Sequence, residues 1–224
     1  MYVGTIMQTD LVTVPPDMSL KKARDIIETR KIAHLLVVDK DEKLMGVISD
    51  RDLKENWASK ATTLSVHELN YLLDQLTLEM IMAKTIITVT PDTTIERAAF
   101  IMQKNRISAL PVIMGSKLSG IITTRDVLGV ILQAIGINED SIRFTVLVKD
   151  RVGVMAEISK ILKDHEISIR SIFTWPEKKH PGVYQLVIRV GAENGETAIE
   201  ALTNGGFKVL RSYVQDLSPF LPEP

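Results

Sequence analysis

The chain has 224 residues and a mass of 25.0 kDa, with 45% hydrophobic, 25% charged and 5% aromatic residues. This composition is typical of a soluble globular protein and argues against a disordered, collagen-like or membrane-spanning chain. The 27 basic and 28 acidic residues give a net charge of −1, so the basic excess that favours nucleic acid as a partner is missing. There is no cysteine, which excludes disulfides, thiolate nucleophiles and cysteine-bound metals.

The chain shows no targeting or membrane signal. Its first residues lack the basic start and apolar run of a signal peptide. The longest apolar stretch, 127–137, is short and is interrupted by glycine and glutamine, so it does not predict a transmembrane helix. We therefore expect a cytoplasmic protein without a membrane partner.

An internal repeat dominates the first 135 residues. At an offset of 75 residues, identical residues recur between segment 6–38 and segment 81–113. After a one-residue deletion the match continues, so that 46–52 (GVISDRD) aligns with 120–126 (GIITTRD). Two copies are too few for a solenoid, so we expect a pseudo-symmetric pair packed against each other.

Each copy predicts the same order of elements: helix, strand, turn, strand, helix. In the first copy these elements are expected at 20–29, 35–38, 44–49 and from 51 onward. In the second copy they are expected at 94–105, 110–113, 118–123 and 125–134, the first helix opening with the capping pattern Thr93 and Glu96. Between the copies, Ser65 and Glu68 form a similar pattern, which predicts a linker helix within 61–77.

The pattern changes after residue 140. Alternating apolar residues predict a strand from 141, a helix over 152–164 with Met155, Ile158, Ile161 and Leu162 facing inward, and a strand over 167–174. A strand at 183–190, a helix at 197–202 and a last strand at 207–213 follow, and the proline-containing tail is expected to be loose. This βαββαβ order is the split βαβ arrangement of ferredoxin-like domains.

Both copies resemble CBS motifs. The sign is a glycine, two apolar residues, a Ser or Thr and an Asp three residues further on, here at 46–52 and 120–126. Segment 150–157 (DRVGVMAE), between a strand and a helix, resembles an ACT domain. The resemblance implies an α+β fold with CBS motif 1 at 1–60, a linker helix at 61–77, CBS motif 2 at 78–136, an ACT-like domain at 141–214 and a tail at 215–224. This combination resembles the acetoin-utilisation AcuB family.

The repeated motif also has a physical reading as a nucleotide site. A strand that ends in a hydroxyl residue directly before a helix places that hydroxyl and free backbone N–H groups at a positive helix end, which suits a phosphate. An aspartate in the first turn can accept ribose hydroxyls, and a neighbouring arginine can pair with phosphate. The CBS resemblance adds an adenosine group, as in AMP, ADP or ATP, in the cleft between the copies.

The resemblance assigns the nucleotide-binding residues to two sites. Site one would use Ser49, Asp52, Ile87, Thr88 and Arg125, with His34 as a basic residue facing phosphate; site two would use Thr123, Asp126, Val12, Thr13 and Arg51. The alternative is structural: each aspartate would only stabilise a helix start, by about 0.3–1 kcal/mol. The second copy has Thr124 for Asp50 and Ala109 for His34, so occupation of both sites is open.

The ACT-like segment offers a second candidate site, for an amino acid. Gly153 permits close backbone approach, and the following helix end could bind a carboxylate. The candidate residues are Asp150, Val152, Gly153, Val154 and Met155. The alternative is that Gly153 only relieves a tight turn and that the domain is a dimer surface.

The sequence favours a regulator over an enzyme. The four histidines, His34, His67, His165 and His180, show no metal-ligand spacing, and no GxSxG, GxGxxG or P-loop motif is present. We expect no catalytic residues, metal or cofactor, and instead a homodimeric sensor in which nucleotide binding is coupled to the ACT domain and a regulated protein. An interaction scaffold without nucleotide and an enzyme of acetoin breakdown are the alternatives.

Overall fold

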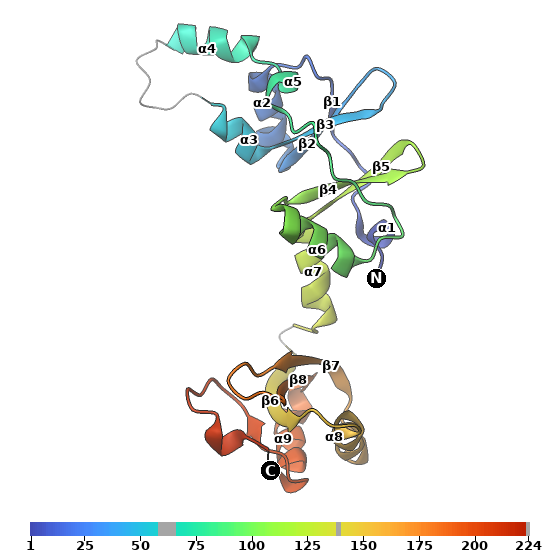
Figure 1. The fold of residues 1–224 in the computed structure, drawn as a ribbon, viewed down its shortest axis with the longest axis vertical. Helices are drawn as coiled ribbons and strands as arrows, with labels where there is room; N and C mark the ends of the chain where they lie inside the picture. The colour runs from blue at the N-terminus through green and yellow to red at the C-terminus, as the bar shows by residue number, and fades with distance from the viewer. Residues whose placement is uncertain (58–65, 138–139, 223–224) are drawn as a thin grey trace. The chain divides into compact units, whose positions relative to one another are not determined.

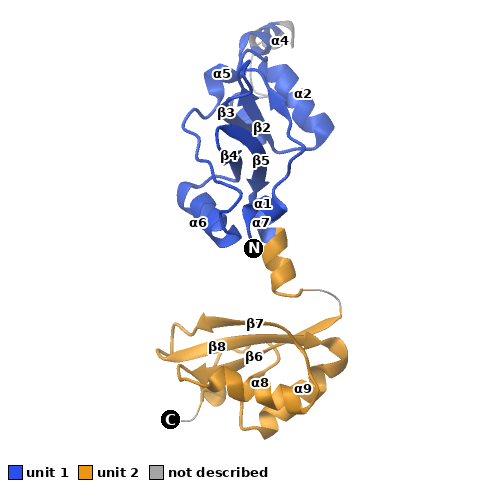
Figure 2. Cartoon of the chain, turned by 90° about the vertical axis from the view of Figure 1, so that its right-hand side faces the viewer, with its two compact units in different colours: residues 1–128 blue, residues 129–224 orange. Residues whose placement is uncertain are grey.

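The computed structural model describes residues 1–57, 66–137 and 140–222. It divides into two compact units, Met1–Leu128 and Gly129–Pro224 (Figure 2). The first unit holds the two repeat copies up to residue 128, and the second holds the end of the second copy's last helix and the βαββαβ region. The predicted α+β fold is confirmed.

The first copy has the predicted order of elements (Figure 1). Its elements are α1 (Val3–Ile6), β1 (Thr13–Val14), α2 (Leu20–Arg30), β2 (His34–Val38), β3 (Leu44–Ser49) and α3 (Asp50–Glu55). β1 pairs in parallel with β2, and β2 pairs antiparallel with β3. The apolar face of α2, Leu20, Ala23 and Ile27, is buried against this sheet, because residues three and four apart lie on one side of a helix.

The linker helix α4 (Val66–Gln75) connects the copies, and the second copy then repeats the order of the first. Its elements are α5 (Leu78–Ile81), which is equivalent to α1, α6 (Ile95–Asn105), β4 (Ala109–Met114), β5 (Lys117–Thr123) and α7 (Thr124–Ala134). The residue that caps α6 is Thr94, whose hydroxyl accepts from the Arg97 N–H at 3.2 Å. The cap predicted at Thr93 is therefore wrong by one residue, because the Thr93 hydroxyl accepts from the Thr90 N–H instead. Ser65, the cap predicted for the linker helix, lies outside the described residues.

The two copies exchange their leading segments, which are the stretches around Gln8 in the first copy and around the equivalent Ala83 in the second. Gln8, which precedes the first copy's strands, bridges Ile121 of β5, and the equivalent Ala83 bridges Val47 of β3. Side chains from both copies, Leu36, Ala109 and Ile121, form one buried cluster. Each copy is therefore completed by the other, and this exchange places residues 83–87 beside β3.

The repeated glycines serve this exchange. A Cβ atom on Gly46 would overlap the Met82 side chain, and one on Gly120 would overlap the Met7 side chain. Met7 and Met82 are equivalent residues of the two leading segments. The motif glycine is thus explained by close packing between the copies rather than by ligand contact.

The second unit is a four-stranded antiparallel sheet with two helices. Its elements are β6 (Ser141–Lys149), α8 (Val154–Asp164), β7 (Ile169–Pro176), β8 (Val183–Gly191), α9 (Gly195–Asn204) and β9 (Val209–Leu210). The strand order is β7-β8-β6-β9, and both helices lie on one face of the sheet (Figure 2). Phe144, Val146 and Val148 of β6 belong to the buried core of this unit, as the alternation predicts.

Three local predictions for the second unit need correction. Met155 is 43% exposed rather than inward, because α8 begins at Val154 and buries the face of Val154, Ile158 and Leu162. The last strand, expected over 207–213, has two residues only. The tail is not loose over its described part, since Ser218–Phe220 form a 3₁₀ helix and Lys208 Nζ donates to the Leu221 carbonyl at 3.0 Å.

Candidate functional site

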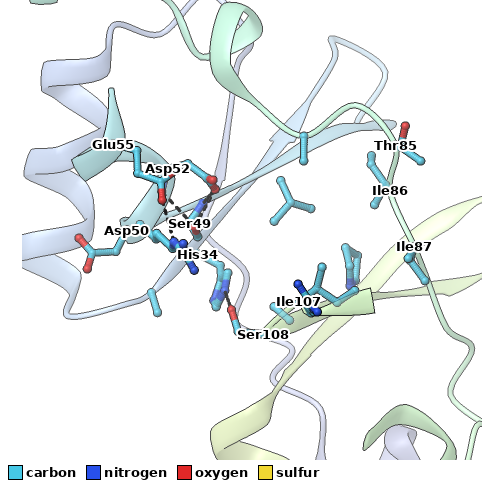
Figure 3. Close-up of a pocket in the computed structure, with 17 residues that line it drawn as sticks. His34, Ser49, Asp50, Asp52, Glu55, Thr85, Ile86, Ile87, Ile107 and Ser108 are labelled. Carbon is cyan, nitrogen blue, oxygen red and sulfur yellow. Dashed lines mark hydrogen bonds and ion pairs between the residues drawn. The ribbon is translucent and has the colours of Figure 1, made fainter. Parts of the chain in front are cut away.

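A cavity of about 700 Å³ lies between the two copies of the first unit (Figure 3). One wall comes from β3 and α3 of the first copy and carries Ser49 and Asp52. The opposite wall comes from the second copy, where Ile86 and Ile87 precede α6 and Ser108 precedes β4. Both walls therefore carry polar side chains, and Ile86 and Ile87 add an apolar surface to the second one.

Ser49 and Asp52 form a reciprocal cap at the start of α3. The Asp52 Oδ2 atom accepts from the Ser49 N–H at 2.7 Å and from the Ser49 hydroxyl at 2.6 Å, and the Asp52 N–H donates back to Ser49 Oγ at 3.2 Å. Asp52 therefore does stabilise the start of α3, which is the structural role considered for it above. The second carboxylate oxygen, Oδ1, has no hydrogen-bond partner among the described residues, so it is available to a ligand.

The equivalent pair in the second copy is fully occupied. Asp126 Oδ2 accepts from the N–H and the hydroxyl of Thr123 at 2.8 and 2.7 Å. Its Oδ1 atom accepts from Gln8 Nε2 at 3.1 Å. The two predicted sites are therefore not equivalent, because protein groups engage both oxygens of Asp126 but only one oxygen of Asp52.

His34 joins the two copies across the cavity. Its Nε2 atom lies 2.9 Å from the hydroxyl of Ser108 (Figure 3). Burial lowers the pKa of His34, and the Asp52 carboxylate opposes this effect by attraction. Burial therefore disfavours the protonated imidazole, the form in which the basic residue expected from the resemblance would pair with a phosphate.

The cavity has one arginine that its neighbours do not neutralise. Arg51 lines this cavity, although the sequence assigned it to the second site, and its Nε atom pairs with Glu55 at 2.7 Å. Arg106 also lines it and has no ion pair among the described residues. The sequence analysis missed Arg106 and Ser108. The repeat contains a pattern that could have identified Arg106. Arg106 and Lys31 are equivalent basic residues, and they end α6 and α2 in the left-handed conformation.

The remaining nucleotide-site predictions divide between this cavity and other places. Ile87 lines the cavity as expected, whereas Thr88 and Arg125 are not part of its lining. Thr13 is the first residue of β1, and Val12 precedes it. The Val12 carbonyl accepts from the Leu36 N–H at 3.3 Å. The structure thus brings Ser49, Asp52, Ile87, His34 and Arg51 together.

The ACT-like candidate residues differ in their surroundings. Val152 is fully exposed, and Val154 is buried in the core and lines a 250 Å³ hollow beside Arg151 and Glu157. Gly153 has φ 93°, a left-handed conformation that favours glycine at this turn. Asp150 donates its backbone N–H to the Gly182 carbonyl at 2.9 Å. The turn therefore explains Gly153 without a ligand.

Metal-ligand clusters and membrane-spanning helices are both absent from the described part of the chain. Over residues 1–57, 66–137 and 140–222, no three His, Asp or Glu side chains gather in a way that could hold a metal ion. No described helix is long and apolar enough to cross a membrane.

Two curated relatives each match a little more than half of this chain. The homoserine O-acetyltransferase of Methanosalsum zhilinae is 39% identical over 126 residues, which are 56% of this chain and 23% of that protein. The inosine-5'-monophosphate dehydrogenase of Methanocaldococcus jannaschii is 34% identical over 120 residues, which are 53% of this chain and 21% of that protein. The chain thus matches less than a quarter of the length of either relative.

A solved structure and two family matches agree with the fold. A CBS-domain-containing protein from Agrobacterium tumefaciens shares 26% identity and a TM-score of 0.51, over 58% of this chain and 98% of that one. The ACT domain family matches residues 142–204. The CBS domain family matches residues 3–59 and 78–133, which make up half of the chain. This chain therefore belongs to the CBS domain family, as a CBS pair followed by an ACT domain.

Proposed function

We propose that the CBS pair binds one adenine nucleotide per chain in the cavity between its two copies. A cavity of about 700 Å³ is within the range of small-molecule sites, roughly 300–1,000 Å³. Ile86 and Ile87 offer an apolar wall for the flat base. The unpaired guanidinium of Arg106 is the phosphate partner in this arrangement.

The observation that carries this proposal is the unpartnered oxygen of Asp52. Asp52 lines the cavity, and this oxygen is free to accept a hydrogen bond from a ribose hydroxyl, whereas Gln8 Nε2 donates to the equivalent oxygen of Asp126. The same motif therefore supports nucleotide binding in the first copy and only a helix cap in the second. On this basis we propose a single site rather than two.

We further propose that the chain is a regulator and not a catalyst. The two relatives named above are enzymes, but the matched part is less than a quarter of each, and among the described residues no three His, Asp or Glu side chains could hold a metal ion. Nucleotide binding would alter how the ACT domain engages a partner protein, which requires that the nucleotide prefer one arrangement of the chain. Assembly as a homodimer and a role in acetoin utilisation stay predictions.

A thermal-shift experiment on the full chain tests the proposal. AMP, ADP, ATP, NAD and S-adenosylmethionine would each be added to the wild type, to Asp52→Ala and to Asp126→Ala. Each substitution removes a helix-capping aspartate, so the pair is matched in structural cost. A ligand at 100 times its Kd stabilises the wild type by about 2.7 kcal/mol.

We expect an adenine nucleotide to raise the Tm of the wild type and of Asp126→Ala by similar amounts. Asp52→Ala should need at least about tenfold more nucleotide for the same shift, the effect of losing about 1.4 kcal/mol of binding. No shift with any ligand, or equal losses in the two variants, would contradict the proposed site.

A further inference from the structure

The ACT unit contains a second cavity, of about 500 Å³, on the sheet face away from its helices. The alternation of β6 explains its position, because Phe144 and Val146 pack into the core with residues of α8 and α9 while Arg143 and Thr145 line this cavity. Leu210 of β9 and Gln185 of β8 complete its floor. All of these residues belong to the second unit.

Two chain segments close the sides of this cavity. One is the loop between β7 and β8, which contributes Glu177, Lys179 and His180, and the other is the segment 212–217 that follows β9. The second segment leads into the Ser218–Phe220 helix and the Lys208 contact that hold the tail in place. The tail therefore forms a wall of the cavity.

A buried hydroxyl lines the floor of the cavity. Thr145 is 4% exposed and is the one polar residue among the buried residues described. Its hydroxyl makes no hydrogen bond within the described part of the chain, and it is not among the described side-chain atoms that are both buried and without a partner. Thr145 lines the cavity, so its hydroxyl is accessible to a ligand there.

The acidic groups of the cavity already have partners. Glu177 Oε1 accepts from the Lys179 N–H at 3.1 Å, and its Oε2 accepts from Gln185 Nε2 at 2.6 Å. Asp216 Oδ1 accepts from the Ser218 N–H at 2.9 Å. The carboxylates are thus engaged by the protein's own donors.

Two basic side chains of the cavity, Arg143 and Lys179, are outside any ion pair in the described part of the chain, although Lys179 lies near enough to Glu177 to help lower the pKa of that carboxyl. Arg143 also lies directly opposite Arg189 in the β6–β8 register, and like charges in such positions repel each other. The available groups are therefore a guanidinium, an ammonium and a hydroxyl, all of which can donate to an anion.

We propose that this cavity is a binding site for a small organic carboxylate. The guanidinium of Arg143 offers paired donors that match a carboxylate, the Thr145 hydroxyl donates from the floor, and Lys179 adds positive charge at the rim. The site differs from the Gly153 turn that the sequence suggested. It shares no residue with the nucleotide cavity, so its test is independent of the proposed function.

Calorimetric titration of the full chain with succinate, and separately with inorganic phosphate, tests this site. The variants are Arg143→Gln, which removes the exposed guanidinium charge, and Thr145→Val, which removes the hydroxyl at similar volume. The control is Lys163→Gln, which removes one exposed positive charge from α8 on the helix side of the sheet. Circular dichroism confirms that each variant is folded.

Succinate should bind the wild type and Lys163→Gln with Kd values within about twofold, and Arg143→Gln at least about tenfold more weakly, a loss of about 1.4 kcal/mol. Thr145→Val should also weaken binding if it folds, and the Arg143 comparison decides the matter if it does not. Absence of succinate binding, or equal binding by Arg143→Gln, overturns the site. Binding of phosphate without succinate overturns the carboxylate assignment.

Discussion

Equivalent residues of the two copies have different partners, and the proposed nucleotide site rests on this difference. Ser49 with Asp52 and Thr123 with Asp126 make the same reciprocal cap. The caps were predictable from the sequence because they join residues three apart. The contact from Gln8 to Asp126 was not, because it joins residues 118 apart and depends on the exchange of leading segments between the copies.

The motif glycines give a residue-level prediction about packing. Gly46→Ala should lower the free energy of unfolding by about 1–3 kcal/mol, because the added methyl overlaps Met82. Gly129→Ala is the matched control, since a Cβ there meets nothing within 4 Å. It should raise stability by about 0.5–1 kcal/mol through helix propensity. Urea denaturation measures both, and a neutral Gly46→Ala would refute this explanation of the motif.

His34 gives a prediction about pH. Its pKa in the folded chain is below the ordinary value of 6.5 because the ring is buried. Between the lowered pKa and 6.5 the unfolded chain binds more protons, so the contribution of neutral His34 is complete above pH 6.5 and is lost as the pH falls through this range. Between pH 7.5 and 5.5 the wild type should therefore lose more stability than His34→Asn. Equal losses in denaturation at the two pH values would show that His34 is not responsible.

At the scale of elements, the sequence predicted helices and strands well where one face is buried by neighbours in the same copy. α2, β3 and α6 lie within one residue of their expected bounds. The errors lie at the ends of helices and strands whose positions depend on turns and on contacts with other elements. α8 starts two residues late because the turn at Gly153 precedes it, and β9 is cut to Val209–Leu210, where it pairs with β6.

The face of α8 gives a prediction at this scale. Ile158 is fully buried whereas Met155 is 43% exposed. Ile158→Ala should therefore cost about 2–5 kcal/mol of unfolding free energy, and Met155→Ala should stay within about 0.5 kcal/mol of the wild type. Thermal unfolding of the two variants compares them directly. A greater loss of unfolding free energy for Met155→Ala than for Ile158→Ala would support the inward orientation of Met155 that the sequence suggested.

For the whole molecule, the repeat predicted a pair of similar copies but not how they share a site. The cavity needs β3 and α3 from one copy and residues 83–87 and 106–111 from the other. Ser108 and Arg106 enter the site only through this pairing, which no local pattern specifies. The two-fold repeat in sequence thus produces a pair in which one candidate site is open and the equivalent aspartate is occupied.

The stoichiometry of AMP binding to the full chain, measured by isothermal titration calorimetry, tests this account most directly. The account predicts one AMP per chain, because Asp52 keeps a free oxygen and Asp126 does not. Two AMP molecules per chain would contradict the assigned asymmetry of the copies. No binding of AMP, ADP or ATP by the folded chain would contradict the nucleotide site itself.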